Sequence, residues 1–214
     1  MKVLVLSSNG KVGTLVAKEL LARGHQVTGN SHSANRNAFI TNFIEKDIRS
    51  LTKEDVAGYD AVVCAYGAFG VPNLGELFAS VNQHLLQILE DSPAYLYVVG
   101  GAGAMIVDAA SGTRLVDTPD FPEVFFDLAS AQANSLRRDF APNKKVNWVF
   151  VSPAVEFDAD APLTKNVAIA GPFFSVNNQG ESFISYADYA WELVNQIEAR
   201  KFNRAWINFR QGDK

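Results

Sequence analysis

The 214-residue chain has few of the residues that build disulfides and metal sites: one cysteine, two methionines and three histidines. A single cysteine, Cys64, excludes an internal disulfide and a metal site made of several cysteines. The three histidines are not spaced like metal ligands, so we expect no bound metal. Cys64 falls inside an apolar segment, where a cysteine is more often part of the core than a nucleophile.

Excess positive charge and long apolar runs are also missing. The chain has 19 Lys and Arg against 23 Asp and Glu, a net charge of −4. This balance argues against a nucleic-acid groove, which needs a basic patch. No apolar segment approaches the roughly 20 residues of a membrane span, and the apolar run at the N-terminus is too short for a signal peptide. These absences favour a cytoplasmic protein that binds neither membranes nor nucleic acid.

The composition is that of an ordinary globular protein, with 48% hydrophobic and 20% charged residues. A chain of this length can bury a sizeable core, and it contains no evident repeat or interdomain linker. We therefore expect a single domain over residues 1–214. Residues 1–151 would form its core, and 152–214 would supply loops, a final helix and a final strand.

Short apolar runs alternate with helix-length segments along the chain. Residues 153–183 interrupt this rhythm, and their Pro, Gly and Asn content predicts loops with a small hairpin. Strands separated by helix-length crossovers predict an α/β fold, a Rossmann-like doubly wound parallel sheet with a small C-terminal embellishment. The expected strands are 1–6, 26–29, 39–45, 60–65, 94–99, 146–151 and 204–209, with helices after the first strand and at 73–90, 121–140 and 186–199.

The first apolar run leads into Ser7-Ser8-Asn9-Gly10-Lys11-Val12-Gly13 and then into a helical pattern. Strand, glycine turn and helix in this order are the frame of a dinucleotide-binding βαβ unit. Gly10 would let the backbone approach a pyrophosphate, and Gly13 would let the helix pack closely on the strand. The positive end of that helix would then face the phosphates. Ser7 stands where the pattern usually has its first glycine, so an ordinary turn without a ligand remains the alternative.

The end of the second strand bears on the choice of cofactor. An NAD site usually has an acidic side chain about 20 residues after the glycine loop. The region from Asn30 to Arg36 reads Asn-Ser-His-Ser-Ala-Asn-Arg and has no acid. Because Ser31, His32 and Arg36 suit a 2′-phosphate, we predict NADP rather than NAD, with a merely solvated polar loop as the alternative. Asp47 would either bond the adenine amino group or cap a turn.

Ligands of a doubly wound sheet bind beyond the carboxyl ends of its strands. No tyrosine has a lysine four positions later, so the Tyr-x-x-x-Lys pair of short-chain dehydrogenases is absent, and Phe125 to Ser130 stand where that pair is expected. We assign no catalytic residue. The predicted cofactor contacts are Ser7, Asn9, Gly10, Lys11, Val12, Ser31, His32, Arg36, Asp47, Ile48, Tyr66, Gly67, Gly100, Gly101 and Pro153.

Four segments carry a family resemblance: 9–13, 98–103, 112–122 and 184–190. In them the chain resembles the atypical short-chain dehydrogenases, a group with NAD(P)H-binding proteins of the NADH-flavin reductase, biliverdin reductase B and NmrA-like types. The resemblance implies an NADP-type cofactor along the strand ends. The whole chain, 1–214, would then be a single NAD(P)-binding domain, with 1–151 as its cofactor-binding core and 152–214 as its substrate side. The resemblance also implies a substrate held over the nicotinamide by Ala102, Gly103, Arg114 and Ala154. Arg114 has a second interpretation, an ion pair with Asp117 that holds the 105–120 excursion in place.

Two functions fit these observations. The first is an NAD(P)H-dependent oxidoreductase that transfers hydride to a flavin, a quinone or a similar planar acceptor, since the resemblance implies reduction without a tyrosine acid. The second is a non-catalytic NADP-binding redox sensor of the NmrA-like type. The sequence leaves the substrate and the oligomeric state open, a homodimer included. The aromatic residues Phe121, Phe125 and Phe126 are core by default, with a substrate wall or a subunit contact as alternatives.

Overall fold

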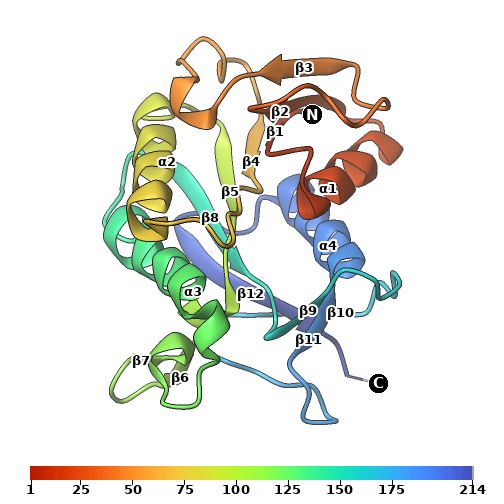
Figure 1. The fold of residues 1–214 in the computed structure, drawn as a ribbon. Coiled ribbons are helices and arrows are strands. Elements are labelled where there is room, and N and C mark those ends of the chain that lie inside the picture. Colours follow the sequence, from red (N-terminus) through yellow and green to blue (C-terminus); the bar gives the residue numbers. More distant parts are fainter. Residues whose placement is uncertain (214) are drawn as a thin grey trace.

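The computed structural model describes residues 1–213. Within this range, eight strands form one sheet in the order β10-β12-β8-β5-β4-β1-β2-β3, and every neighbouring pair is parallel except β10 and β12. This order confirms the predicted Rossmann-like α/β fold (Figure 1). The strands are β1 (Lys2–Leu6), β2 (Gln26–Ser31), β3 (Asn42–Glu45), β4 (Ala61–Cys64), β5 (Tyr95–Val99), β8 (Asn147–Ser152), β10 (Val167–Ala170) and β12 (Ala205–Gln211).

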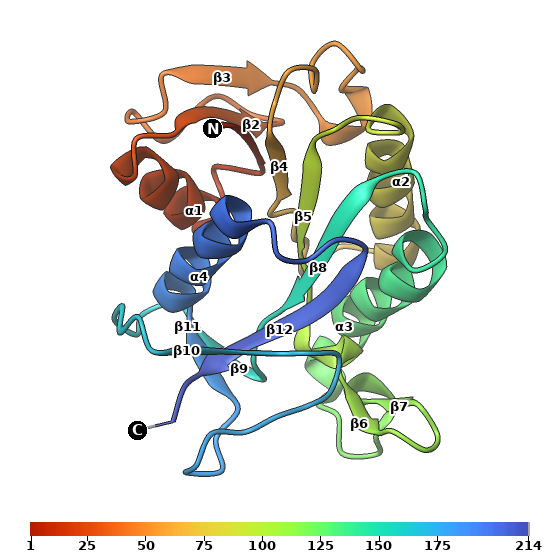
Figure 2. The ribbon, with the colours of Figure 1, turned by 180° about the vertical axis from the view of Figure 1, so that it is seen from behind.

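Two layers of helices cover the sheet. Helices α1 (Lys11–Ala22) and α4 (Tyr186–Ala199) lie together on one face, and α2 (Leu74–Ile88) and α3 (Glu123–Ser135) lie on the other, as the two opposite views show (Figures 1 and 2). Residues Leu136–Phe140 extend α3 as a π-helical turn. None of the helices formed by residues 1–213 has the length and apolar character needed to cross a membrane.

The apolar first strand follows from this double cover. Val3 and Val5 pack into the core beneath α1 and α4, while Leu4 and Leu6 pack into the core beneath α2 and α3. Successive side chains of a strand point to opposite faces, so a strand with both faces buried has no polar alternation. The same reason accounts for the fully buried β4 (Ala61–Cys64).

The C-terminal third differs from the prediction in its short strands. The hairpin predicted within residues 153–183 is wrong: β9 (Glu156–Asp158) pairs in parallel with β11 (Phe183–Ser185), and β10 joins the main sheet against β12. A hairpin occurs elsewhere, between β6 (Ile106–Asp108) and β7 (Thr113–Arg114). Strands this short find their partners far away in the sequence, so the local pattern does not reveal their pairing.

Candidate functional site

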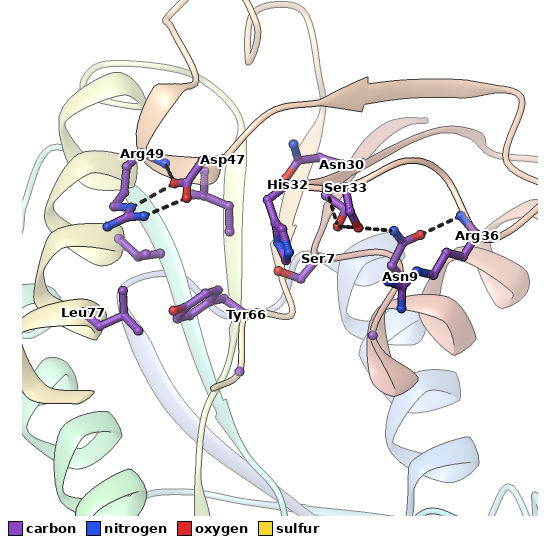
Figure 3. Close-up of a pocket in the computed structure, with 15 residues that line it drawn as sticks. Ser7, Asn9, Asn30, His32, Ser33, Arg36, Asp47, Arg49, Tyr66 and Leu77 are labelled. Carbon is purple, nitrogen blue, oxygen red and sulfur yellow. Dashed lines mark hydrogen bonds and ion pairs between the residues drawn. The ribbon is translucent and has the colours of Figure 1, made fainter. Parts of the chain in front are cut away.

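Parallel strands β1, β2 and β4 end at the same edge of the sheet, and a cavity of about 260 Å³ lies there (Figure 3). Its walls come from the ends of β1, β2 and β4 and the loops that follow them, from the segment after β3 and from α2. The lining residues are Ser7, Asn9, Gly10, Asn30, Ser31, His32, Ser33, Arg36, Asp47, Ile48, Arg49, Tyr66, Gly67, Leu77 and Val81.

Most of the predicted cofactor contacts meet in this cavity: Ser7, Asn9, Gly10, Ser31, His32, Arg36, Asp47, Ile48, Tyr66 and Gly67. The other predicted contacts are not among its lining residues. Lys11 and Val12 open α1, whereas Gly100, Gly101 and Pro153 follow β5 and β8 further along the same edge. The list of predicted contacts lacks Asn30 and Ser33, although both lie in the polar region 30–36 that the sequence singled out, and sequence reasoning missed Arg49, Leu77 and Val81. Of these, Leu77 and Val81 had a visible signal, because they stand four residues apart on one face of the predicted helix.

The glycine loop, residues 7–13, makes a tight turn between β1 and α1. Ser7 adopts a left-handed backbone conformation with φ 56°, which glycine adopts without strain and serine does not. The Ser7 carbonyl oxygen accepts a hydrogen bond from the Gly10 N–H at 2.9 Å. A Cβ atom at Gly13 would lie 2.5 Å from that oxygen, so the close packing of α1 on the loop requires glycine. Gly10 caps α1 without a side-chain hydrogen bond, which leaves first-turn N–H groups for a ligand.

Asn9 ties the loop after β2 to the glycine loop. Its Nδ2 donates to the Ala34 carbonyl oxygen at 2.9 Å, and its Oδ1 accepts from the Arg36 backbone N–H at 3.0 Å. The side chain of Arg36 is exposed and lines the cavity beside Asn9 (Figure 3). Its guanidinium group has no hydrogen bond or ion pair with any residue of the 1–213 range. The cavity therefore contains a free positive charge next to the glycine loop.

Asp47 and Arg49 stand across the cavity from Asn9 and Arg36 (Figure 3). Asp47 caps the short 3₁₀ turn Ile48–Ser50 by accepting from the Arg49 N–H, and its carboxylate also accepts from Arg49 Nε at 2.9 Å and Nη2 at 2.7 Å. These side-chain hydrogen bonds lower the pKa of Asp47 to about 2. Of the two predicted roles, the turn cap is present in the fold, and the contact with adenine stays a prediction.

The end of β5 is covered by a polar side chain of α3. The Gln132 side chain lies directly on Gly101, and Ala129 packs on Gly103. Ala129 belongs to the stretch Phe125 to Ser130, which stands where the Tyr-x-x-x-Lys pair of short-chain dehydrogenases is expected. Beside Gln132, a small cavity behind Tyr66 contains the fully buried Ser135 hydroxyl, which has no hydrogen-bond partner within the described residues.

The thiol of Cys64 is confirmed as part of the core. Only 2% of the residue is exposed, and burial raises the pKa of the thiol to about 11. Since the thiolate is the reactive form, we expect no labelling of the native protein by iodoacetamide at pH 8 over an hour, and one label per chain in 8 M urea. Rapid labelling without denaturant would contradict the buried position of this side chain.

Comparisons with known proteins place this geometry in a family. The chain is 38% identical over 200 residues to the uncharacterized protein YwnB of Bacillus subtilis, covering 92% of each protein. A structure from Streptococcus pneumoniae, described as a putative NADH-flavin reductase, is 40% identical with a TM-score of 0.94 over 99% of each chain. The chain belongs to the atypical short-chain dehydrogenase family of NAD(P)H-binding proteins. A Lactobacillus casei structure is 26% identical, with a TM-score of 0.88 over the full length of both chains. No family model matches the chain.

In this atypical short-chain dehydrogenase, the Arg114 guanidinium group is hydrogen-bonded to two neighbouring side chains, Asp117 and Asn134. Its Nε and Nη2 donate to the two carboxylate oxygens of Asp117 at 2.7 and 2.8 Å, and Nη1 donates to Asn134 Oδ1 at 2.9 Å. These bonds join the β6–β7 hairpin to α3. The predicted ion pair between Arg114 and Asp117 is therefore present in the segment 105–120. The other predicted role of Arg114, a direct contact with a substrate, stays a prediction.

Proposed function

We propose that the protein is an NADPH-dependent oxidoreductase that transfers hydride to a planar acceptor such as a flavin or a quinone. The observation that carries the proposal is the cavity at the strand ends, where the glycine loop stands beside Arg36, whose side chain has no partner among residues 1–213. Similarity to a protein described as an NADH-flavin reductase supports the reaction class.

The glycine loop fits a pyrophosphate. Gly10 lines the cavity, and its lack of a side chain lets the backbone approach a ligand closely. The first turn of α1 has no side-chain cap, so its N–H groups and its positive dipole end are available to anionic oxygens. Lys11 and Val12 would contribute backbone N–H groups from that turn.

The surroundings of Arg36 fit a 2′-phosphate better than a pair of free ribose hydroxyls. The hydroxyl groups of Ser31 and Ser33 lie 3.4 Å apart beside it and can donate to phosphate oxygens. The carboxylate that lines the cavity, Asp47, is bound by Arg49, so its charge is compensated. These groups favour NADPH over NADH.

NADPH would supply a hydride, which is two electrons and a proton, and the acceptor would take its second proton from water. Hydride transfer of this kind depends mainly on placing two flat rings in contact. The residues at the end of β5 would do this placing. The Ser152 hydroxyl donates to the Gly101 carbonyl oxygen at 3.0 Å and accepts from Trp206 Nε1 at 3.1 Å, which fixes the backbone where the nicotinamide would lie.

Replacing Arg36 with alanine tests the cofactor preference. Loss of a charged hydrogen bond typically costs about 1.5–3 kcal/mol, so the Kd for NADPH should rise roughly 10- to 100-fold while the Kd for NADH changes less than about twofold. Fluorescence titrations of the wild type and of Arg36→Ala with both nucleotides measure this. Arg137→Ala, which removes an exposed arginine from the π-helical turn, is the matched control and should leave both constants unchanged.

Equal affinity of the wild type for NADPH and NADH would contradict the preference, and failure of both nucleotides to bind would remove the premise of the function. A turnover assay with flavin and quinone acceptors then separates the enzyme from the NADP-binding sensor. Sustained NADPH consumption supports the enzyme, and binding without consumption of NADPH supports the sensor.

A further inference from the structure

Two phenylalanine side chains form an exposed aromatic pair outside the cavity described above. Phe69 is 61% and Phe125 51% exposed, and their ring centroids lie 6.2 Å apart with an interplanar angle of 50°. The default assignment of Phe125 to the core is therefore wrong, as it is for Phe126, which is 46% exposed. Apolar rings that touch each other and remain open to solvent often mark a binding surface.

The pair stands beside the expected position of the nicotinamide. Phe69 lies in the loop after β4, two residues beyond Gly67, which lines the cavity. Phe125 and Gln132 are seven residues apart in α3 and therefore share one face of the helix. Gln132 lies on Gly101 at the end of β5. Phe125, with Phe69 beside it, and Gln132 therefore lie on one face of α3, and Gln132 is the one at the end of β5.

Gln132 has an amide group that the fold does not use. Its side chain makes no hydrogen bond with another residue of the described chain, although it is half-buried over Gly101. It lines the small cavity that also contains the buried, unpartnered Ser135 hydroxyl. An amide offers both donors and an acceptor, so it can pair with the carbonyl and ring nitrogen atoms of a conjugated heterocycle.

We propose that Phe69, Phe125 and Gln132 form the acceptor subsite, and that its occupant is the isoalloxazine ring of a flavin. The two phenyl rings would contact the flat ring in stacked or tilted geometry, and Gln132 would hydrogen-bond to its polar edge. This proposal rests on the proposed function, because it assumes that the nicotinamide lies over Gly101. It goes further by naming the residues that select a planar heteroaromatic acceptor.

Riboflavin is the probe, because its fluorescence reports binding without turnover. The protein is saturated with NADP⁺, which cannot reduce the flavin, and titrated with riboflavin. For Phe69→Ala and Phe125→Ala the Kd for riboflavin should rise roughly three- to tenfold, the range expected for the loss of one aromatic contact. The Kd for NADPH should stay within about twofold of the wild-type value. Gln132→Ala should also weaken riboflavin binding.

Phe126→Ala is the matched control, because it removes another exposed phenylalanine side chain, one position further along α3. This variant should bind riboflavin like the wild type. An equal loss with Phe126→Ala, or no loss with the two pair variants, would overturn the subsite. If Phe69→Ala and Phe125→Ala instead lower the mass of the protein in analytical ultracentrifugation with riboflavin affinity intact, the patch is a contact with a second copy and the proposal is wrong.

The two proposals fail in different ways. NADPH binding without riboflavin binding by the wild type would overturn the subsite and leave the dinucleotide site standing. Riboflavin binding that depends on Phe69 and Phe125, in a protein that does not bind NADPH, would support the flavin subsite and overturn the proposed function.

Discussion

Replacing Gly13 with alanine is expected to abolish NADPH binding and to lower the free energy of unfolding by about 2–3 kcal/mol, the upper part of the usual range for overpacking. The added Cβ would lie 2.5 Å from the Ser7 carbonyl oxygen and 3.0 Å from the Ser8 Cα atom. Both are backbone atoms, so neither can turn away as a flexible side chain would. The clash can be relieved only if α1 moves away from the glycine loop. This movement would displace Gly10 and the N–H groups of the first turn of α1.

Urea unfolding and an NADPH titration measure the two effects. Gly75→Ala is the matched control, since Gly75 is in α2 and a Cβ there would have no heavy atom within 4 Å. This variant should gain about 0.5–1 kcal/mol, because alanine is the better helix former. Wild-type stability and NADPH affinity in Gly13→Ala would show that the close contact between α1 and the loop is not needed.

The central fold was predictable because its strands are buried on both faces. β1 and β4 give short, uninterrupted apolar runs, and a crossover of helical length follows each of them. Helix α4 begins at Tyr186 and ends at Ala199, as predicted. Its start is specified locally, because the Ser185 hydroxyl accepts a hydrogen bond from the Asp188 N–H as an N-cap.

Elements that depend on remote partners were not predictable. β10 has four residues, and Val167 pairs with Gln211 at the other end of the C-terminal third. The rotation of α3 was also missed. Its apolar residues Phe125 and Phe126 are exposed, whereas the polar Gln132 faces the strand ends. At the edge of a binding site, the apolar face of a helix need not be its buried face, so periodicity alone misplaces it.

The position of the cavity followed from a topological rule. The carboxyl ends of β1, β2 and β4 must meet at one edge in a parallel sheet, and polar residues after each strand therefore meet as well. Arg49 was missed for a different reason. Its side chain reaches the cavity through a bidentate bond with Asp47, and the sequence gives no sign of how either side chain is directed.

Replacing Asp188 with alanine is expected to lower the free energy of unfolding by about 2–3 kcal/mol, because a hydrogen bond to a charged group typically contributes about 1.5–3 kcal/mol. The donors Thr164 and Lys165 are exposed, so water partly replaces the lost acceptor. Asp188 is 1% exposed. Its carboxylate accepts from the Thr164 N–H at 2.8 Å, the Thr164 hydroxyl at 2.8 Å and the Lys165 N–H at 2.7 Å. These three bonds fasten the turn before β10 to the start of α4.

Differential scanning calorimetry of three variants tests this role. Asp188→Asn keeps one acceptor oxygen and should lose less stability than Asp188→Ala. Asp160→Ala removes an exposed carboxylate nearby and should change stability by less than about 0.5 kcal/mol. Asp188 belongs to the segment 184–190 that carries part of the family resemblance, so the outcome decides why the family has this segment. Lower stability with unchanged NADPH affinity in the folded variant assigns it to the architecture, whereas weaker NADPH binding at wild-type stability would assign it to the site instead.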